Sequence, residues 1–259
     1  MQIVTFTRST PDTAAKVDVD SSGAVSWGNA ATVVNPWDEY ALEEAIVQAG
    51  KADGKTVVVA VGPEMHNDAL KHSIAMGINE AMRIQDDALD PNDSLAYATA
   101  AAALVKSLGD VDLVLFGKES VDVGSDQHIY QTARKLGWPM LSGVSKILEL
   151  DSTGKKIKVE KMTEHGKQVL SSSLPAVLSV SKEINEPRYP SFIGIRKASK
   201  AEIQQKSLAD LGASAPSKRT EVTGFRGLPV RDTQVELIDG TPEEQAKTLV
   251  DRLLAEKVL

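Results

Sequence analysis

"KTVVVAVG", residues 55–62, is the stretch that decides the fold. It is an almost uninterrupted run of Val and Ala, which is typical of a strand buried on both faces of a parallel sheet. A second run of this kind, "VDLVLFG", occupies residues 111–117. Helix-like stretches at 63–77 and 93–109, with a short strand at 80–85, lie between the two runs. This alternation predicts an α/β fold with a mostly parallel, doubly wound sheet and helices on both faces.

Outward from these strands the same alternation continues in both directions. The helix at 35–50 begins with Asn35 as N-cap and Pro36 at the first helical position, which is a common start signal. The other expected elements are a strand at 2–6, a hairpin at 15–28, a helix at 125–137, a strand at 139–150, a β-hairpin at about 155–173 and a strand at 174–183.

The last quarter of the chain follows a different pattern. Residues 184–240 contain four prolines and few periodic stretches, so we expect them to lie along another surface. The chain closes with an amphipathic helix in which Thr241 and Glu244 have the spacing of a capping box. The sequence therefore predicts one α/β domain over 1–183 and, over 184–259, an arm that wraps around a partner.

Composition limits the classes of function. The chain has 259 residues, a formal net charge of −7 and no cysteine, which argues against a general nucleic-acid binder and excludes thiolate ligands. We expect no membrane span, because no apolar run approaches 18 residues. The sequence shows no leader, so a prokaryotic cytoplasm is expected, or a mitochondrial matrix if a leader has been removed.

The sequence offers no catalytic or metal-binding constellation. His66 and His72 are six residues apart, which does not place them on one helix face for a shared metal. No serine lies in the strand–turn–helix elbow that hydrolases use. We therefore expect no metal site, and the residues give no support for hydrolase chemistry.

One loop has the features of an anion site. "GKESVDVGSDQH", residues 117–128, leaves a buried strand and opens a helix, and helix N-termini attract phosphate. An ordinary capped strand-to-helix turn explains the same residues. Asp126 near the cap counts against an anion, because its carboxylate would already occupy the helix N-terminus.

A second loop has the features of a docking surface. "INEPRYPSFIGIRKASK", residues 184–200, places aromatic and aliphatic side chains in a proline-broken segment with a rim of bases. A buried aromatic anchor with a charged rim is typical of protein interfaces. A plain surface loop is the alternative.

The order of motifs along the chain resembles that of the β (small) subunit of electron transfer flavoprotein. The stretches that carry this resemblance are "VVNPWDEYALEEAI", "VVAVGP", "AMGINEA", "VDLVLFGKESVD", "LGWP", "LPAVLSV" and "NEPRYPSFIGIRKA". The resemblance implies a heterodimer whose α (large) subunit holds FAD. It also implies electron transfer from flavoprotein dehydrogenases, such as the acyl-CoA dehydrogenases of fatty acid oxidation, towards a quinone oxidoreductase.

The resemblance also implies a second nucleotide in this subunit, either AMP or a second FAD. The residues implied for it are Phe6, Arg8, Val61, Gly62, Asp122, Gly124, Ser125, Asp126, Gln127 and His128. Two departures from the AMP-binding pattern stand out. Asp126-Gln127-His128-Ile129 replaces an Asn-x-Thr-Gly run, and Phe6 replaces a small residue. Trp37 aligns with an aromatic residue that approaches the flavin.

For the docking loop, the resemblance implies an apolar anchor that enters a pocket on the partner dehydrogenase. The usual anchor is Leu, and Phe192 holds its place here. The residues implied in docking are Tyr189, Phe192, Ile193, Arg196 and Lys197. Two alternatives stay open: an electron-bifurcating form with FAD in this subunit, and a stand-alone nucleotide-binding stress-type α/β protein.

Overall fold

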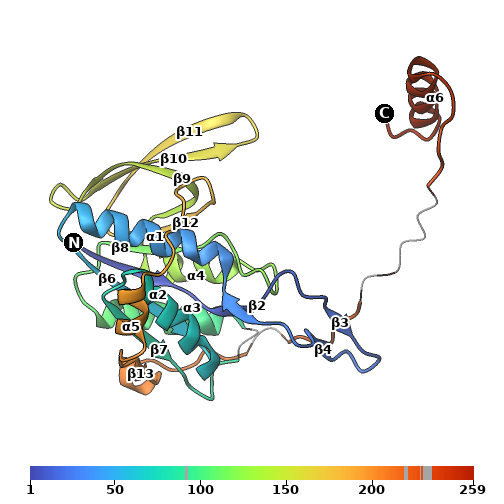
Figure 1. Cartoon of the computed structure of the whole chain (residues 1–259). Helices are drawn as coiled ribbons and strands as arrows, with labels where there is room; N and C mark the ends of the chain where they lie inside the picture. The colour runs from blue at the N-terminus through green and yellow to red at the C-terminus, as the bar shows by residue number, and fades with distance from the viewer. Residues whose placement is uncertain (91–92, 219–220, 228, 230–234) are drawn as a thin grey trace. The chain divides into compact units, whose positions relative to one another are not determined.

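The computed structural model describes residues 1–90, 93–218, 221–227, 229 and 235–259 (Figure 1). Contacts divide the chain into two compact units, Met1–Phe225 and Arg226–Leu259. The predicted division after residue 183 stays a prediction. Among the described residues, no helix combines the length and the apolar character needed to cross a membrane.

A nine-stranded sheet forms the centre of the first unit, in the order β11-β10-β9-β12-β8-β1-β6-β7-β13. The strands are β1 Gln2–Phe6, β6 Lys55–Val61, β7 Glu80–Ile84, β8 Leu113–Phe116, β9 Met140–Asp151, β10 Lys156–Thr163, β11 Gly166–Ser173, β12 Ala176–Val180 and β13 Gln204–Lys206. From β9 to β13 in this order, each strand pairs with the next in parallel. The pairs β9–β10 and β10–β11 are antiparallel. The mostly parallel sheet with a hairpin is therefore confirmed.

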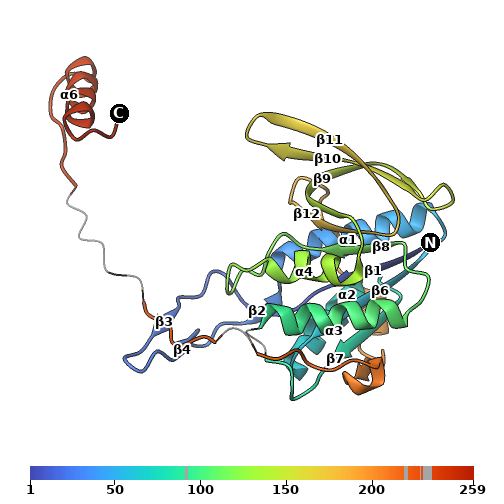
Figure 2. The same ribbon diagram turned by 180° about the vertical axis from the view of Figure 1, so that it is seen from behind.

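Alternation along β6 explains why both faces of the sheet are covered. Val58 and Ala60 lie in one buried cluster and Val57 and Val59 in the other, because successive side chains of a strand point to opposite faces. Helices α1 (Pro36–Lys51) and α2 (Asn67–Met76) cover the first face, and α3 (Ser94–Ser107) and α4 (Gln127–Leu136) cover the second (Figures 1 and 2).

Small elements complete the chain. They are β2 Ser9–Pro11 paired with β5 Thr32–Val34, β3 Asp18–Val19 paired with β4 Val25–Ser26, the 3-10 turns η1 Glu64–His66 and η2 Ala209–Leu211, and the helices α5 Phe192–Ala198 and α6 Pro242–Ala255. The capping box at the start of α6 is present, as predicted for Thr241 and Glu244. Helix α1 ends at Lys51 rather than at residue 50.

The expectation of little compact structure over 184–240 is wrong for part of that segment. Helix α5 packs on α2, and β13 extends the sheet by pairing with β7 through residues 204–206. Both elements are short and lie next to prolines or polar residues, so the sequence has no hydrophobic periodicity that would predict them. The first compact unit consequently continues to Phe225.

The two edges of the sheet differ. Strand β13 is only three residues long, while β11 runs over eight residues, and among the described residues no strand pairs with its outer side. Its sequence is "GKQVLSSS", and most of these residues are exposed.

Candidate nucleotide cleft and docking segment

Two aromatic rings meet at the carboxyl edge of the sheet. The parallel neighbours β1 and β8 end at Phe6 and Phe116, and the two rings stack with centroids 4.7 Å apart and planes 6° apart. The ring of Tyr97 on α3 lies 6.2 Å from that of Phe6. His128, in the first turn of α4, meets Tyr97 edge-on at 4.7 Å and Phe116 at 5.8 Å. We call Phe6, Tyr97, Phe116 and His128 the edge cluster.

The edge cluster leaves little room at this edge of the sheet. The cleft there has a volume of about 10 Å³ and is lined by Phe6, Arg8, Asp38, Tyr97 and His128 among others. Such a volume is at the limit for a single water molecule, whereas pockets for small molecules measure roughly 300–1,000 Å³. The cleft between Phe6, Arg8 and His128 therefore has no room for AMP or a second FAD in this arrangement.

The charged side chains in the cleft interact with other residues of this chain. The Arg8 guanidinium lies over the Tyr97 ring, 5.3 Å from its centroid, and donates to Ser120 Oγ at 3.3 Å. Burial raises the pKa of Asp38 to about 7, against the opposing effect of the nearby Arg8 charge. Burial lowers the pKa of His128 to about 3. His128 is therefore neutral at physiological pH and supplies no charge for a phosphate.

The loop after β8 packs directly against the start of α1. A Cβ on Gly117 would lie 2.5 Å from the Trp37 carbonyl carbon and 2.6 Å from Asp38 Oδ1, so only glycine fits there. Asn35 Nδ2 donates to the Glu119 carbonyl at 2.9 Å. Asn35 Oδ1, the atom that could cap α1, accepts from Val121 N at 3.2 Å instead, and Asn35 makes no side-chain capping bond among the described residues.

The turn before α4 differs from expectation at one residue. Asp126 is the N-cap of α4, but within the described chain its carboxylate accepts no capping hydrogen bond. The expectation that Asp126 fills the helix N-terminus is therefore wrong. The turn is held instead by backbone bonds, from Ser120 N to the Ser125 carbonyl at 3.0 Å and from Gly124 N to the Ser120 carbonyl at 2.8 Å.

The predicted nucleotide residues are only partly brought together. Phe6, Arg8 and His128 line the cleft, and the other seven lie outside its described lining. Gly62, which follows Val61 at the end of β6, donates to the Ile84 carbonyl at 2.9 Å. Gln127 accepts from Ser94 Oγ at 3.4 Å, and Asp122 accepts from Ser120 Oγ.

The predicted docking residues form a second, separate feature. Residues 192–198 are helix α5 rather than a loop, with Ser191 Oγ accepting from Gly194 N at 3.0 Å as its cap. Tyr189 and Phe192 are each 94% exposed and Ile193 is 84% exposed. Arg196 and Lys197 follow on the same short helix and are exposed. We call residues 189–197 the docking segment.

Comparison with known proteins shows the family of this chain. The family model "Electron transfer flavoprotein domain" matches residues 28–211. The chain is 32% identical over 258 residues to "Electron transfer flavoprotein subunit beta" of Bacillus subtilis (strain 168), covering 99% of this chain and 98% of the relative. It belongs to the electron transfer flavoprotein family, as a β (small) subunit.

Two further relatives support the membership. A subunit beta of Thermoanaerobacterium thermosaccharolyticum is 30% identical over 270 residues, with complete coverage of both chains. "Protein FixA" of Azotobacter vinelandii is 29% identical, covering 86% of this chain and 82% of the relative. Membership of the electron transfer flavoprotein family implies an electron-transfer protein with an associated flavin and an α-subunit partner.

Several residues that matter in this β subunit were not among the predicted site residues. Tyr97 and Phe116 complete the edge cluster, and Asp38 is buried beside Arg8. Phe116 could have been predicted to lie at this edge of the sheet. It ends a buried strand as Phe6 does, and the carboxyl ends of parallel strands meet at one edge. The half-buried Trp37 lies outside the cleft, with Lys118 Nζ 5.1 Å above its ring, and its role towards a flavin stays a prediction. Among the described residues, no group of His, Asp and Glu is arranged to hold a metal.

Proposed function

We propose that this β subunit, in a heterodimer with an α subunit that holds FAD, takes electrons from flavoprotein dehydrogenases such as acyl-CoA dehydrogenases. It passes them towards a quinone oxidoreductase and performs no bond-making step of its own. The observation that supports docking is the docking segment, where Tyr189, Phe192 and Ile193 are almost fully exposed. Large exposed apolar groups next to charged ones typically mark interaction sites.

The chemistry of the segment indicates what kind of surface it meets. An aromatic anchor that enters a pocket contributes most of the binding energy of an interface. The bases Arg196 and Lys197 follow the anchor on α5, and such charges raise the association rate with an acidic surface. We therefore propose a dehydrogenase surface with an apolar pocket and an acidic rim.

The filled cleft bears on the cofactors. A bifurcating form needs a second flavin in this subunit, and the cleft lined by Phe6, Arg8 and His128, three of the residues implied for that nucleotide, is too small for one. We propose one FAD for each heterodimer, held mainly by the α subunit, with Trp37 on the flavin side. Bacterial relatives with coverage above nine tenths support a cytoplasmic location.

Replacing the anchor tests this function. Phe192→Ala, in the heterodimer with its α subunit, should raise the carrier concentration that half-saturates electron transfer from an acyl-CoA dehydrogenase. We expect an increase of roughly 30- to 1,000-fold, because truncating an anchor costs on the order of 2–4 kcal/mol. FAD content and reduction by dithionite should be unchanged. Tyr130→Ala, at a 44% exposed aromatic on α4, is the matched control.

Two results would contradict the proposal. One is a wild-type heterodimer that holds FAD but accepts no electrons from any flavoprotein dehydrogenase tested. The other is a Phe192→Ala heterodimer that accepts them with unchanged concentration dependence, which would make the exposed ring a surface residue without a docking role.

A further inference from the structure

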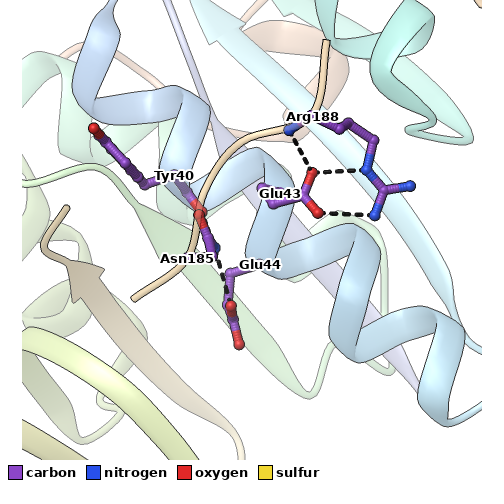
Figure 3. A network of polar contacts seen from close by, with 5 residues as sticks. All are labelled: Tyr40, Glu43, Glu44, Asn185 and Arg188. Atoms are coloured by element: carbon purple, nitrogen blue, oxygen red, sulfur yellow. Dashed lines mark hydrogen bonds and ion pairs between the residues drawn. The ribbon is translucent and has the colours of Figure 1, made fainter. Parts of the chain in front are cut away.

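A polar network ties the segment before the docking residues to helix α1 (Figure 3). Arg188 donates from Nε to Glu43 Oε2 at 2.7 Å and from Nη2 to Glu43 Oε1 at 2.8 Å. Its backbone N–H also donates to Glu43 Oε2, at 3.2 Å. The carboxylate of Glu43 thus holds both the side chain and the backbone of one residue, and that fixes the orientation of the chain as well as its position.

Asn185, three residues before Arg188, makes a second pair of contacts with α1. Asn185 Nδ2 donates to the Tyr40 carbonyl and to Glu44 Oε2, both at 3.0 Å. Glu44 is itself held by Gln48 Nε2 at 2.6 Å. The consecutive acids Glu43 and Glu44 therefore each bind one residue of the 185–188 stretch, as Figure 3 shows.

The acids on α1 are largely removed from solvent. Glu43 is 6% exposed and Glu44 is 5% exposed, while the Arg188 side chain is 46% exposed. Separating Glu43 from Arg188 would leave a buried carboxylate without a partner, which is strongly unfavourable. We therefore expect the ion pair to stay formed. A half-exposed guanidinium with a buried partner is suited to fix the chain at the rim of the core.

Phe192 lies between this network and a second point of attachment. Only three residues separate Arg188 from Phe192, and Pro190 is one of them, which restricts the backbone. Beyond Phe192, helix α5 rests on α2, where a Cβ on Gly194 would lie 2.1 Å from the Ala75 carbonyl oxygen. Ala198 is 4% exposed against the same core. The exposed ring is thus bracketed by two fixed points.

We propose that the Glu43–Arg188 pair is a positioning element that presents Phe192 to the partner dehydrogenase. This inference rests on the docking role proposed above. The pair acts by holding the backbone at residue 188, so that the ring of Phe192 projects outward before the partner arrives. Preorganisation of this kind reduces the ordering cost of binding.

A double-mutant cycle tests whether the pair acts through Phe192. Arg188→Lys retains the charge but loses the two-pronged geometry, and should raise the half-saturating carrier concentration on the order of 3- to 10-fold. With Phe192→Ala already present, adding Arg188→Lys should change that concentration by less than about twofold, because residues that act as one unit are not additive. The maximal rate and the FAD content should not change. Arg134→Lys on α4 is the matched control.

An independent readout follows the backbone itself. In the heterodimer without dehydrogenase, Arg188→Lys and Glu43→Gln should each speed amide hydrogen exchange over residues 189–198, and leave exchange in α4 unchanged. Unchanged exchange over 189–198 would overturn the positioning role. So would strict additivity of Arg188→Lys and Phe192→Ala, which would mean that Arg188 contacts the dehydrogenase directly. If Phe192→Ala does not affect transfer, the docking role fails, and the exchange experiment still decides whether the pair fixes the segment.

Discussion

His128 lies between the rings of Tyr97 and Phe116, where burial lowers its pKa to about 3 from an ordinary value of 6.5. Above pH 6.5 the imidazole is neutral in the folded and unfolded chain. Between pH 6.5 and 3 the unfolded chain binds a proton that the folded chain does not bind. The free energy of unfolding should therefore fall as the pH falls, by about 1.4 kcal/mol per pH unit from this residue.

His128→Phe should remove that dependence while keeping a ring in the edge cluster. Urea unfolding at equal protein concentration should show the wild type losing about 1.4 kcal/mol more than the variant between pH 6 and pH 5. The pKa of Asp38 is raised to about 7, so this residue changes the free energy of unfolding with pH in the opposite direction. Asp38 is present in the wild type and in the variant, so its contribution cancels in the comparison. His165→Phe, at an exposed hairpin position, is the control. Equal slopes for wild type and His128→Phe would mean that His128 titrates freely in the folded chain.

The edge cluster also predicts the nucleotide content of the heterodimer. Because Phe6 and His128 leave a cleft of about 10 Å³, heat-released small molecules should contain FAD and no AMP. Chromatography of the released fraction at known protein concentration measures this. Recovery of AMP, or of two FAD for each heterodimer, would show that the cluster opens in the assembled protein.

The sequence placed three residues of this cleft at one edge of the sheet but did not predict that side chains fill it. The resemblance implied Phe6 and Arg8, and their place agrees with the rule that ligands bind at the carboxyl ends of parallel strands. The stacking of Phe6 on Phe116 depends on the side-chain conformations of two strands that are far apart in the chain, and no local pattern encodes it. The same is true of Asp126, whose cap position was evident while the direction of its carboxylate was not.

At the level of elements, the contact between α5 and α2 passes through Gly194. A methyl group there would lie 2.1 Å from the Ala75 carbonyl oxygen, so Gly194→Ala should push α5 off α2 and destabilise the chain by about 1–3 kcal/mol. Alanine favours the helix itself, so a loss of stability reports the packing contact. Thermal unfolding and amide exchange over residues 189–198 measure both effects.

Gly50 on α1 provides the matched comparison for this substitution. A Cβ at Gly50 meets no described atom within 4 Å. Gly50→Ala should therefore leave stability unchanged or raise it by up to about 1 kcal/mol. If both alanine variants have the same stability, α5 does not depend on close approach to α2.

Elements with a clear hydrophobic periodicity were predicted well, and short elements were not. The strands at 55–61 and 113–116 and the helices that separate them agree with the structure within a few residues, because long apolar runs and capping residues specify them locally. Helix α5 has seven residues and β13 has three. Their formation depends on α2 and β7, which lie far away in the sequence.

At the scale of the whole molecule, residues 226–259 form a compact unit of their own. Helix α6 exposes apolar side chains, with Leu249, Val250 and Leu254 between 46% and 55% exposed. Such a helix needs a partner to cover it. The sequence-based expectation of a partner-wrapping arm agrees with this composition and stays a prediction.

Limited proteolysis tests that role of the arm. In the chain expressed without its α subunit, trypsin should remove the C-terminal unit early, with cleavage at the exposed Arg226. In the heterodimer the same cut should be slower by at least about tenfold, because a covered segment is a poor protease substrate. Intact mass measured over time gives both rates. Equal rates would show that the arm does not contact the α subunit.

The outer edge of β11 has a consequence for how the chain behaves without its partner. A long open strand edge is a template on which further strands stack into fibrils. Lys167 and the run Ser171–Ser173 make this edge polar, and β13 makes the opposite edge too short to recruit another molecule. On β11 the one large exposed apolar side chain is that of Val169, whereas several lie on helices α5 and α6. A β subunit without its α partner should therefore aggregate as amorphous precipitate and not as amyloid.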